Sequence, residues 1–269
     1  MVGSSEDVRI AIVREALRQT AAHPFDDPPP LMARKINCIM RELSGVRDPY
    51  LDAKDKSAEV AKELLAWAVD SQDFKSCDPF EAAVRLSIAG NIIDYGVDFN
   101  FKIEDAHSKI SGAFREPIDL AALDRLRKAI SAASEILFIS DNCGEAVFDR
   151  LLIELFKDKA ILAVRGEPIL NDLTRREIEA SALTGLPGKG LVDTGDCTPG
   201  ISLRHSSQEF IAAFNRAPLI IAKGQGNFET LSDTRRPIAF LFRAKCDVVC
   251  KFLGGASLGS YQVLTSNLP

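Results

Sequence analysis

Short apolar runs alternate with amphipathic helical segments over the second half of the chain, and this alternation constrains the fold more than any other feature. The apolar runs are expected to form strands at residues 136–140, 161–164, 191–194, 219–222, 238–242 and 261–264. Helices are expected between them, at residues 145–156, 174–183, 207–215, 227–232 and 246–253. Strands separated by helices pair in parallel, with helices on both faces of the sheet. The sequence therefore predicts an α/β fold with a doubly wound, mainly parallel sheet.

The first 115 residues or so have helical periodicity without intervening strands. Helices are expected at residues 8–21, 31–43, 55–69 and 79–93. The sequences HPFDDPPP, SGVRDP and DYGVD, which are rich in turn-forming residues, are expected to separate or end them. We therefore expect two domains, an all-helical one over residues 1–115 and an α/β one over residues 116–269.

The net charge of −5 argues against broad attraction to nucleic acid or to an anionic membrane, because both require clustered Lys and Arg. The N-terminal sequence lacks the uninterrupted apolar stretch of a signal peptide, and no segment approaches the length of a membrane span. A cytoplasmic protein is the expectation. Six scattered cysteines in a chain of this size favour reduced thiols over a disulfide framework. The sequence leaves the oligomeric state open.

Polar residues follow each of the first five apolar runs. In an open parallel sheet, ligands bind beyond the carboxyl ends of the strands, where loops and helix N-termini converge. These strand ends therefore predict a binding site. The residues in chain order are Asp141, Asn142, Gly144 and Glu145, then Arg165, Gly166, Asn171 and Asp172, then Gly195 and Asp196, then Lys223, Gly224, Gly226 and Asn227, and finally Arg243 and Lys245.

Two carboxylates and an amide, from Asp141, Asp172 and Asn142, form the candidate metal site. Oxygen ligands of this kind suit magnesium or manganese and leave room for water and a phosphate oxygen. Lys223 and Lys245 could then balance the charge of a phosphate. A simpler interpretation stays open, in which the two Asp/Asn pairs only cap the helices that follow them.

Several common motifs are absent. GLPGKGL lacks the Ser or Thr and the glycine spacing of a P-loop, no G-x-G-x-x-G follows the first strand, and no H-E-x-x-H occurs. The three histidines have no spacing typical of a zinc site or a triad, and only His205 is expected near the strand ends.

Five motifs carry a resemblance to a known family: ISDNCGE, VRGEPILNDLT, DTGDCTPG, IAKGQGNFETL and FRAKC, in this order, with IAGNIIDYG upstream. The chain resembles the metal-dependent damage-control phosphatases, also called domain of unknown function eighty-nine. The resemblance implies an α/β/α sandwich with a helical domain that caps the site. It also implies hydrolysis of phosphate esters of small, damaged or surplus metabolites, such as sugar phosphates or phosphopantetheine, supported by manganese, magnesium, nickel or cobalt.

The resemblance assigns roles to residues of this sequence. It places the metal on Asp141, Asn142 and Asp172, and catalytic roles on Asp141, Asp172 and Lys245. This chain departs from the family's Arg-x-x-Lys pattern, because Arg243 lies two rather than three residues before Lys245. We expect the substrate contacts to be Asn91, Gly144, Glu145, Arg165, Asn171, Asp196, Lys223, Gly224, Gly226, Asn227 and Lys245.

Two mechanisms and two other functions remain open. Attack on phosphorus could come from a metal-bound water or from an aspartate, with Asp172 and Asp196 as candidates for nucleophile or general base. A methyltransferase acting in the same crevice is one alternative function, which the lack of a glycine-rich first loop disfavours. A non-catalytic protein that binds phosphorylated ligands is the other.

Overall fold

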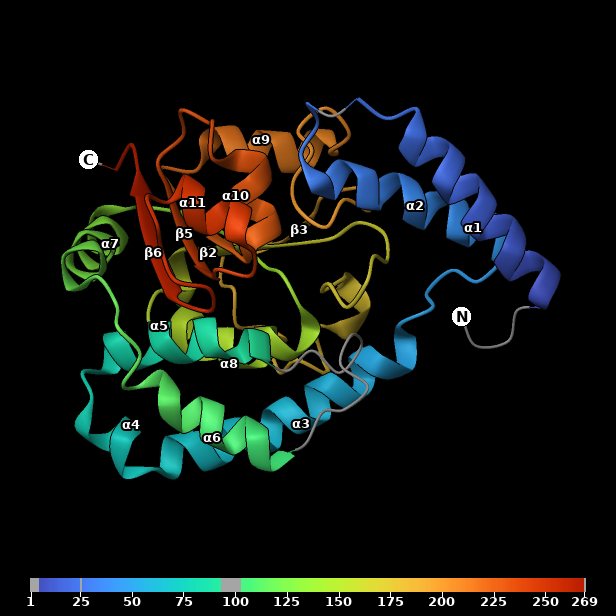
Figure 1. Cartoon of the computed structure of the whole chain (residues 1–269). Helices are drawn as coiled ribbons and strands as arrows, with labels where there is room; N and C mark the ends of the chain where they lie inside the picture. Colours follow the sequence, from blue (N-terminus) through green and yellow to red (C-terminus); the bar gives the residue numbers. More distant parts are fainter. Residues whose placement is uncertain (1–4, 25, 93–102, 269) are drawn as a thin grey trace.

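The computed structural model describes residues 5–24, 26–92 and 103–268, and these form a twisted sheet between layers of helices (Figure 1). The strands are β1 (Ile136–Ile139), β2 (Ala160–Val164), β3 (Gly190–Asp193), β4 (Leu219–Lys223), β5 (Ile238–Arg243) and β6 (Tyr261–Ser266). The helices are α1 (Glu6–Ala21), α2 (Pro29–Ser44), α3 (Leu51–Asp70), α4 (Gln72–Ser76), α5 (Pro79–Ala89), α6 (Ile103–Ala113), α7 (Leu120–Ala132), α8 (Cys143–Glu154), α9 (Gln208–Arg216), α10 (Gln225–Leu231) and α11 (Asp247–Phe252).

The strand order is β3-β2-β1-β4-β5-β6, and the first five strands are parallel. β6 runs antiparallel to β5 and closes one edge. The chain first builds the sheet outward from β1 through β2 and β3, and then returns to add β4 on the other side of β1. The resulting switch point lies between β1 and β4, where doubly wound folds bind their ligands. The predicted α/β fold with a mainly parallel sheet is confirmed.

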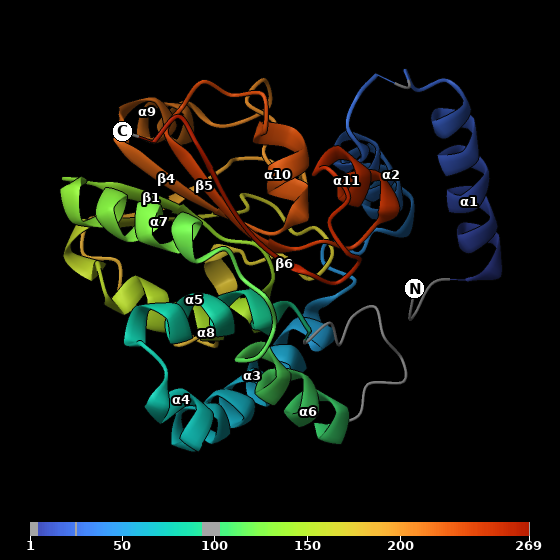
Figure 2. The ribbon, with the colours of Figure 1, turned by 60° about the vertical axis from the view of Figure 1, so that its left-hand side comes forward.

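Alternate residues of each strand serve two separate cores, as the pleat of a strand requires. In β1, Ile136 and Phe138 join the core under α7 and α8, whereas Leu137 and Ile139 join the core under α9, α10 and α11. Both faces of the central strand β1 are fully buried, which explains its uninterrupted apolar sequence. Figure 2 shows the two helical layers on either side of the strands.

The N-terminal helices pack onto the first of these cores. Apolar residues of α3, α5 and α6 belong to the same buried cluster as those of α8 and the strands. Gly90 allows this close packing, since a Cβ atom there would lie 2.9 Å from Cδ2 of Phe148. α1 packs against α2, which in turn contacts α10. The domain boundary between residues 115 and 116 stays a prediction.

One predicted helix is wrong. Residues 174–183 form only a short 3₁₀ helix, Arg175–Glu177, followed by turns. Thr174 and Glu177 do make a capping box, but the chain soon leaves helical geometry, with Ala182 at a φ of 55° and the Leu183 amide bonded to the Ile178 carbonyl. The capping box is the sequence pattern that begins a helix, but the turn before Gly185 ends it after one turn.

The predicted helix at 79–93 ends earlier than expected, at Ala89, and continues as the 3₁₀ turn Gly90–Ile92. The expected DYGVD turn lies outside the described residues. No helix in the described part of the chain is long and apolar enough to cross a membrane.

Candidate active site

The Asp141–Asn142 pair and the Asn171–Asp172 pair lie side by side at the carboxyl edge of the sheet. Asn142 and Asp172 form an isolated antiparallel β-bridge. The Cys143 amide donates to the Asn171 carbonyl at 2.9 Å, and the Leu173 amide donates to the Asp141 carbonyl at 2.8 Å. The loops after β1 and β2 are therefore joined by their backbones, which fixes the two pairs relative to each other.

A tight turn brings Asp172 back toward β1. The Asp172 amide donates to the Ile169 carbonyl at 3.0 Å, and Leu170 between them adopts a φ of 45°. A left-handed conformation at a branched side chain is unfavourable and persists only where its surroundings enforce it. Leu170 itself lines the cavity described below.

Arg165 lies behind the two acidic residues and is almost fully buried. Its Nε donates to Oδ2 of Asp172 at 2.6 Å, and its Nη2 lies 3.5 Å from Oδ1 of Asp141. Nη2 also donates to Oδ1 of Asn227 at 3.2 Å. One guanidinium thus holds both carboxylates, and Asn227 orients it.

The pKa of Asp141 is raised well above its usual range, first by burial and then by the charges of Asp172 and Glu145. Burial also raises the pKa of Asp172, although the charge and hydrogen bond of Arg165 act in the opposite direction. Two carboxylates beside one guanidinium, one buried and the other 12% exposed, therefore favour additional positive charge at this place.

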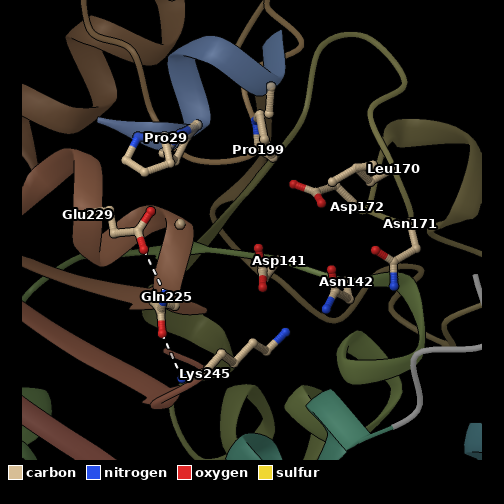
Figure 3. Close-up of a pocket in the computed structure, with 13 residues that line it drawn as sticks. Pro29, Asp141, Asn142, Leu170, Asn171, Asp172, Pro199, Gln225, Glu229 and Lys245 are labelled. Carbon is tan, nitrogen blue, oxygen red and sulfur yellow. Dashed lines mark hydrogen bonds between the residues drawn. The ribbon is translucent and has the colours of Figure 1, made fainter. Parts of the chain in front are cut away.

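A cavity of about 280 Å³ opens in front of these residues. Figure 3 shows the Lys245 side chain extending toward Asp141 and Asn142 from the opposite wall. α2 forms another wall through Pro29, Pro30 and Ala33. The full lining is Pro29, Pro30, Ala33, Asp141, Asn142, Leu170, Asn171, Asp172, Pro199, Gln225, Gly226, Glu229 and Lys245.

Gln225 and Glu229 of this lining were not among the residues singled out from the sequence, although both belong to the IAKGQGNFETL motif. The Gln225 side chain donates to Oε1 of Glu229 at 2.7 Å and accepts from the Lys245 amide at 2.8 Å, as Figure 3 shows. Burial raises the pKa of Glu229. The two residues are one turn apart on α10, and α10 begins directly after β4, so their position at a strand end was visible in the sequence. Pro29 and Pro30 of α2, which we call the proline wall, could not be assigned to the site from the sequence, because a Pro-rich segment is most often only a connector between helices.

Two glycines predicted in the site are required by close approach. Gly224 has a φ of 80°, and a Cβ atom there would lie 2.0 Å from Oδ2 of Asp141. A Cβ atom on Gly226 would lie 2.2 Å from the Pro199 carbonyl oxygen. Gly226 lines the cavity, and Gly224 lets the end of β4 pass directly under Asp141.

Lys223, Glu145 and Asn91 lie beneath the site and do not line its cavity. The Lys223 ammonium donates to Oε1 of Glu145 at 2.5 Å, to Oδ1 of Asp149 at 2.8 Å and to the Ser87 carbonyl at 2.9 Å. The Asn91 side chain donates to Oε2 of Glu145 at 3.1 Å. The charge of Lys223 is therefore already matched by two buried carboxylates.

The remaining predicted residues also lie outside the cavity lining. Asp196 accepts from Nε of Arg34 at 2.7 Å and so faces α2. Arg243 donates to the Gly259 carbonyl at 2.9 Å, which leaves Lys245 as the cation of this segment that lines the cavity. Gly144 is buried within α8. His205 lines a different cavity.

The residues at the cavity fit a hard divalent cation. Within the described ranges, no group of three His, Cys, Asp or Glu residues could hold a metal ion. The candidate donors are instead two carboxylates and one amide, a set of oxygen ligands that suits magnesium or manganese. Burial is the main cause of the raised pKa of both aspartates, and a cation bound beside them would favour their ionised form.

Comparison with known proteins gives consistent matches over nearly the whole chain. A family model described as the damage-control phosphatase ARMT1-like domain matches residues 3–259. A damage-control phosphatase of Pyrococcus horikoshii is 37% identical over 214 residues, which cover 78% of this chain and 72% of that protein. A damage-control phosphatase of Archaeoglobus fulgidus is 32% identical over 260 residues, which cover 94% of this chain and 89% of that protein.

A solved structure has the same fold. The crystal structure of a DUF89 family protein from Pyrococcus horikoshii aligns with a TM-score of 0.85 and 31% sequence identity. The alignment covers 97% of this chain and 91% of that chain. The similarity thus includes both the sheet and the N-terminal helices.

Proposed function

The chain belongs to the damage-control phosphatase family with the ARMT1-like domain, and from this premise we propose that it is a metal-dependent phosphatase of small phosphorylated metabolites. The single observation that carries the proposal is the arrangement at the cavity. The carboxylates of Asp141 and Asp172 and the amide of Asn142 lie on one side, and the ammonium of Lys245 extends toward them from the other. Such a site can bind a cation and a phosphate together.

The metal would be held by Asp141, Asn142 and Asp172, and manganese, magnesium, nickel or cobalt would suit these ligands. When bound, it supplies a Lewis acid that polarises the phosphoryl group and offsets its charge. Arg165 keeps Asp141 and Asp172 in place through its contacts with both carboxylates.

Lys245 would contact the phosphate and offset the negative charge that develops during transfer. Three acids line the cavity, and two of them, Asp141 and Asp172, are the candidate metal ligands, so one of these two would either take a proton from the attacking water or attack phosphorus itself. Asp196 is a poorer candidate, since its carboxylate is bound by Arg34 and by Thr198.

The rest of the substrate would lie against α10 and the proline wall. Gln225 and Glu229 can exchange hydrogen bonds with hydroxyl groups, which suits a sugar phosphate. We also propose that the helical region over residues 1–115 acts as a cap, because Pro29, Pro30 and Ala33 of α2 line the cavity.

A phosphatase screen tests this function. Purified protein would be stripped of metal with a chelator and assayed for phosphate release from sugar phosphates, phosphopantetheine and nucleotides, with and without manganese, magnesium, nickel or cobalt. We expect turnover that requires metal and that disappears in Asp141→Ala. Activity that survives chelation, or that is unchanged in Asp141→Ala, contradicts the proposal.

Two further results would assign the details. Trapping with hydroxylamine would detect an acyl-phosphate if an aspartate attacks phosphorus, and its absence would favour attack by water. If no compound is turned over but phosphorylated ligands raise the melting temperature, the protein is a phospho-ligand-binding protein instead.

A further inference from the structure

A second cavity lies on another face of α2, away from the candidate active site. It has a volume of about 170 Å³, and we call it the α2 cavity. Pro29 and Ala33 of α2 line the candidate active site, whereas Arg34 and Lys35 line the α2 cavity. Its six lining residues come from α2, the segment before it and the loop before α9, and they are Asp27, Leu31, Arg34, Lys35, Arg204 and His205.

The lining of the α2 cavity is strongly basic. Arg34, Lys35 and Arg204 carry positive charge, and Asp27 carries the opposing charge. The whole chain has a net charge of −5, so this cluster departs from the rest of the molecule. A concentration of cations in a concave place attracts small anions.

The existing contacts leave part of this charge uncompensated. Nη2 of Arg204 lies 3.0 Å from Oδ1 of Asp27, and Nε of Arg34 lies 2.7 Å from Oδ1 of Asp196. The Lys35 ammonium instead lies 2.9 Å from Nδ1 of His23. Because an ammonium can only donate, that ring nitrogen must be the acceptor, so Lys35 faces an uncharged atom rather than a carboxylate.

His23 adds an unpartnered donor beside this cluster. With Nδ1 as the acceptor, the proton of the ring sits on Nε2, which is buried and has no hydrogen-bond partner among the described residues. Its nearest carboxylate atom is Oδ2 of Asp27, 3.6 Å away. Asp27 is thus approached by Arg204 and by His23, and among the described residues it makes no ion pair with Lys35.

We propose that the α2 cavity binds a phosphate dianion through Lys35, Arg34 and Arg204. Guanidinium groups present a fork of N–H donors that matches the oxygens of phosphate, and an ammonium adds a compact charge beside them. The phosphate could be inorganic or could belong to a metabolite, and the same charges recognise both. The ion pair between Arg34 and Asp196 joins this cavity to the loop that carries Pro199 in the wall of the candidate active site.

Titration calorimetry with inorganic phosphate tests the proposal on the full chain, in the presence of a chelator so that bound metal does not contribute. The α2-cavity variant is Lys35→Gln/Arg204→Gln, and Lys245→Gln weakens the candidate active site alone. Lys189→Gln is the matched control, because Lys189 is exposed just before β3, at the opposite end of that strand from the site. We expect phosphate binding that is retained in Lys245→Gln and Lys189→Gln and weakened at least about tenfold in the α2-cavity variant.

Binding that is unchanged in the α2-cavity variant overturns the proposal. If the double variant does not fold, which thermal unfolding would reveal, the single change Lys35→Gln provides the test, with a weaker but measurable loss as the expected result. Glycerol 3-phosphate in a parallel titration separates the sources: tighter inorganic phosphate indicates the free ion, and tighter glycerol 3-phosphate indicates a metabolite. Binding of neither compound contradicts the proposal. Since no turnover is involved, these outcomes are independent of the phosphatase assay.

Discussion

Arg165 and Asp172 form an ion pair in the interior of the protein, with Nε 2.6 Å from Oδ2 and side chains only 1% and 3% exposed. The same guanidinium approaches Asp141. Arg165 was predicted to contact substrate, but it lies behind the acids rather than in the cavity lining. Its structural effect is to hold the two candidate metal ligands together.

Arg165→Met should therefore destabilise the protein severely. Removing one partner of a buried pair leaves an uncompensated charge, which typically costs about 3–5 kcal/mol. Arg175→Met is the matched control, because Arg175 makes a pair of the same length with Asp193 at the surface, and such a pair contributes about 0–1 kcal/mol. Urea unfolding gives both values. If both variants lose the same free energy of unfolding, Arg165 is not needed to neutralise the carboxylates of Asp141 and Asp172.

Gly224→Ala should abolish metal-dependent activity because its Cβ would meet the Asp141 carboxylate at 2.0 Å. Gly254→Ala is the control, since Gly254 has a φ of 78° against 80° for Gly224 but nothing within 4 Å of the added atom. Both variants place a side chain at positive φ and should lose stability, by about 1–3 kcal/mol at Gly224, whose φ of 80° and ψ of 155° are essentially restricted to glycine. Only Gly224→Ala should lose activity. If Gly254→Ala is equally inactive, the loss of activity comes from backbone strain and not from contact with Asp141.

Lys245→Gln should raise KM for a phosphorylated substrate by about tenfold or more, which corresponds to about 1.4 kcal/mol or more of binding free energy. The change preserves the backbone contact between the Lys245 amide and Gln225 and removes only the charge that faces the candidate metal ligands. Lys251→Gln removes an exposed charge from α11 and should leave KM unchanged. Steady-state kinetics over a range of salt concentrations provides the measurement. An equal effect of both changes would indicate long-range attraction rather than direct contact.

Asp149 should make folding stability depend on pH in the acidic range. Burial raises the pKa of Asp149 to about 6 from an ordinary value of 3.8, although Lys223 acts in the opposite direction. The folded protein then binds this proton more tightly than the unfolded chain does. The resulting stabilisation is complete below about pH 4 and is lost as the pH rises through about 6.

Asp149→Asn should remove this dependence. The difference in free energy of unfolding between the variant and the wild type should therefore change between about pH 4 and pH 6 and become constant above about pH 7. Urea unfolding at a series of pH values measures this difference. A constant difference over the whole range would mean that Asp149 has the same pKa in the folded and unfolded states.

The sequence predicted the strands and the edge of the sheet where the candidate site lies. Each of the six expected apolar runs overlaps an observed strand. β1, β2 and β4 are buried along their whole length, which requires an apolar run, whereas the edge strands β3 and β6 are only partly buried. The polar residues that follow β1 and β2 could then be assigned to one edge, since parallel strands end on the same side. The antiparallel direction of β6 was not predicted, because its apolar run carries no information about direction.

Only the tertiary structure decided which polar side chains reach the cavity. Lys223 and Lys245 both follow apolar runs, yet Lys223 is the last residue of β4 and lies among the acids of α8, whereas Lys245 lies beyond β5 and faces the cavity. The pleat of β4 points Lys223 toward α8, whereas Lys245 lies two residues beyond the end of β5 and is not bound by strand alternation. Asp196 likewise meets Arg34 from a distant helix, which no local pattern could indicate. The sequence by itself determined where the strands end, and packing between distant segments determined which charges were left to bind a ligand.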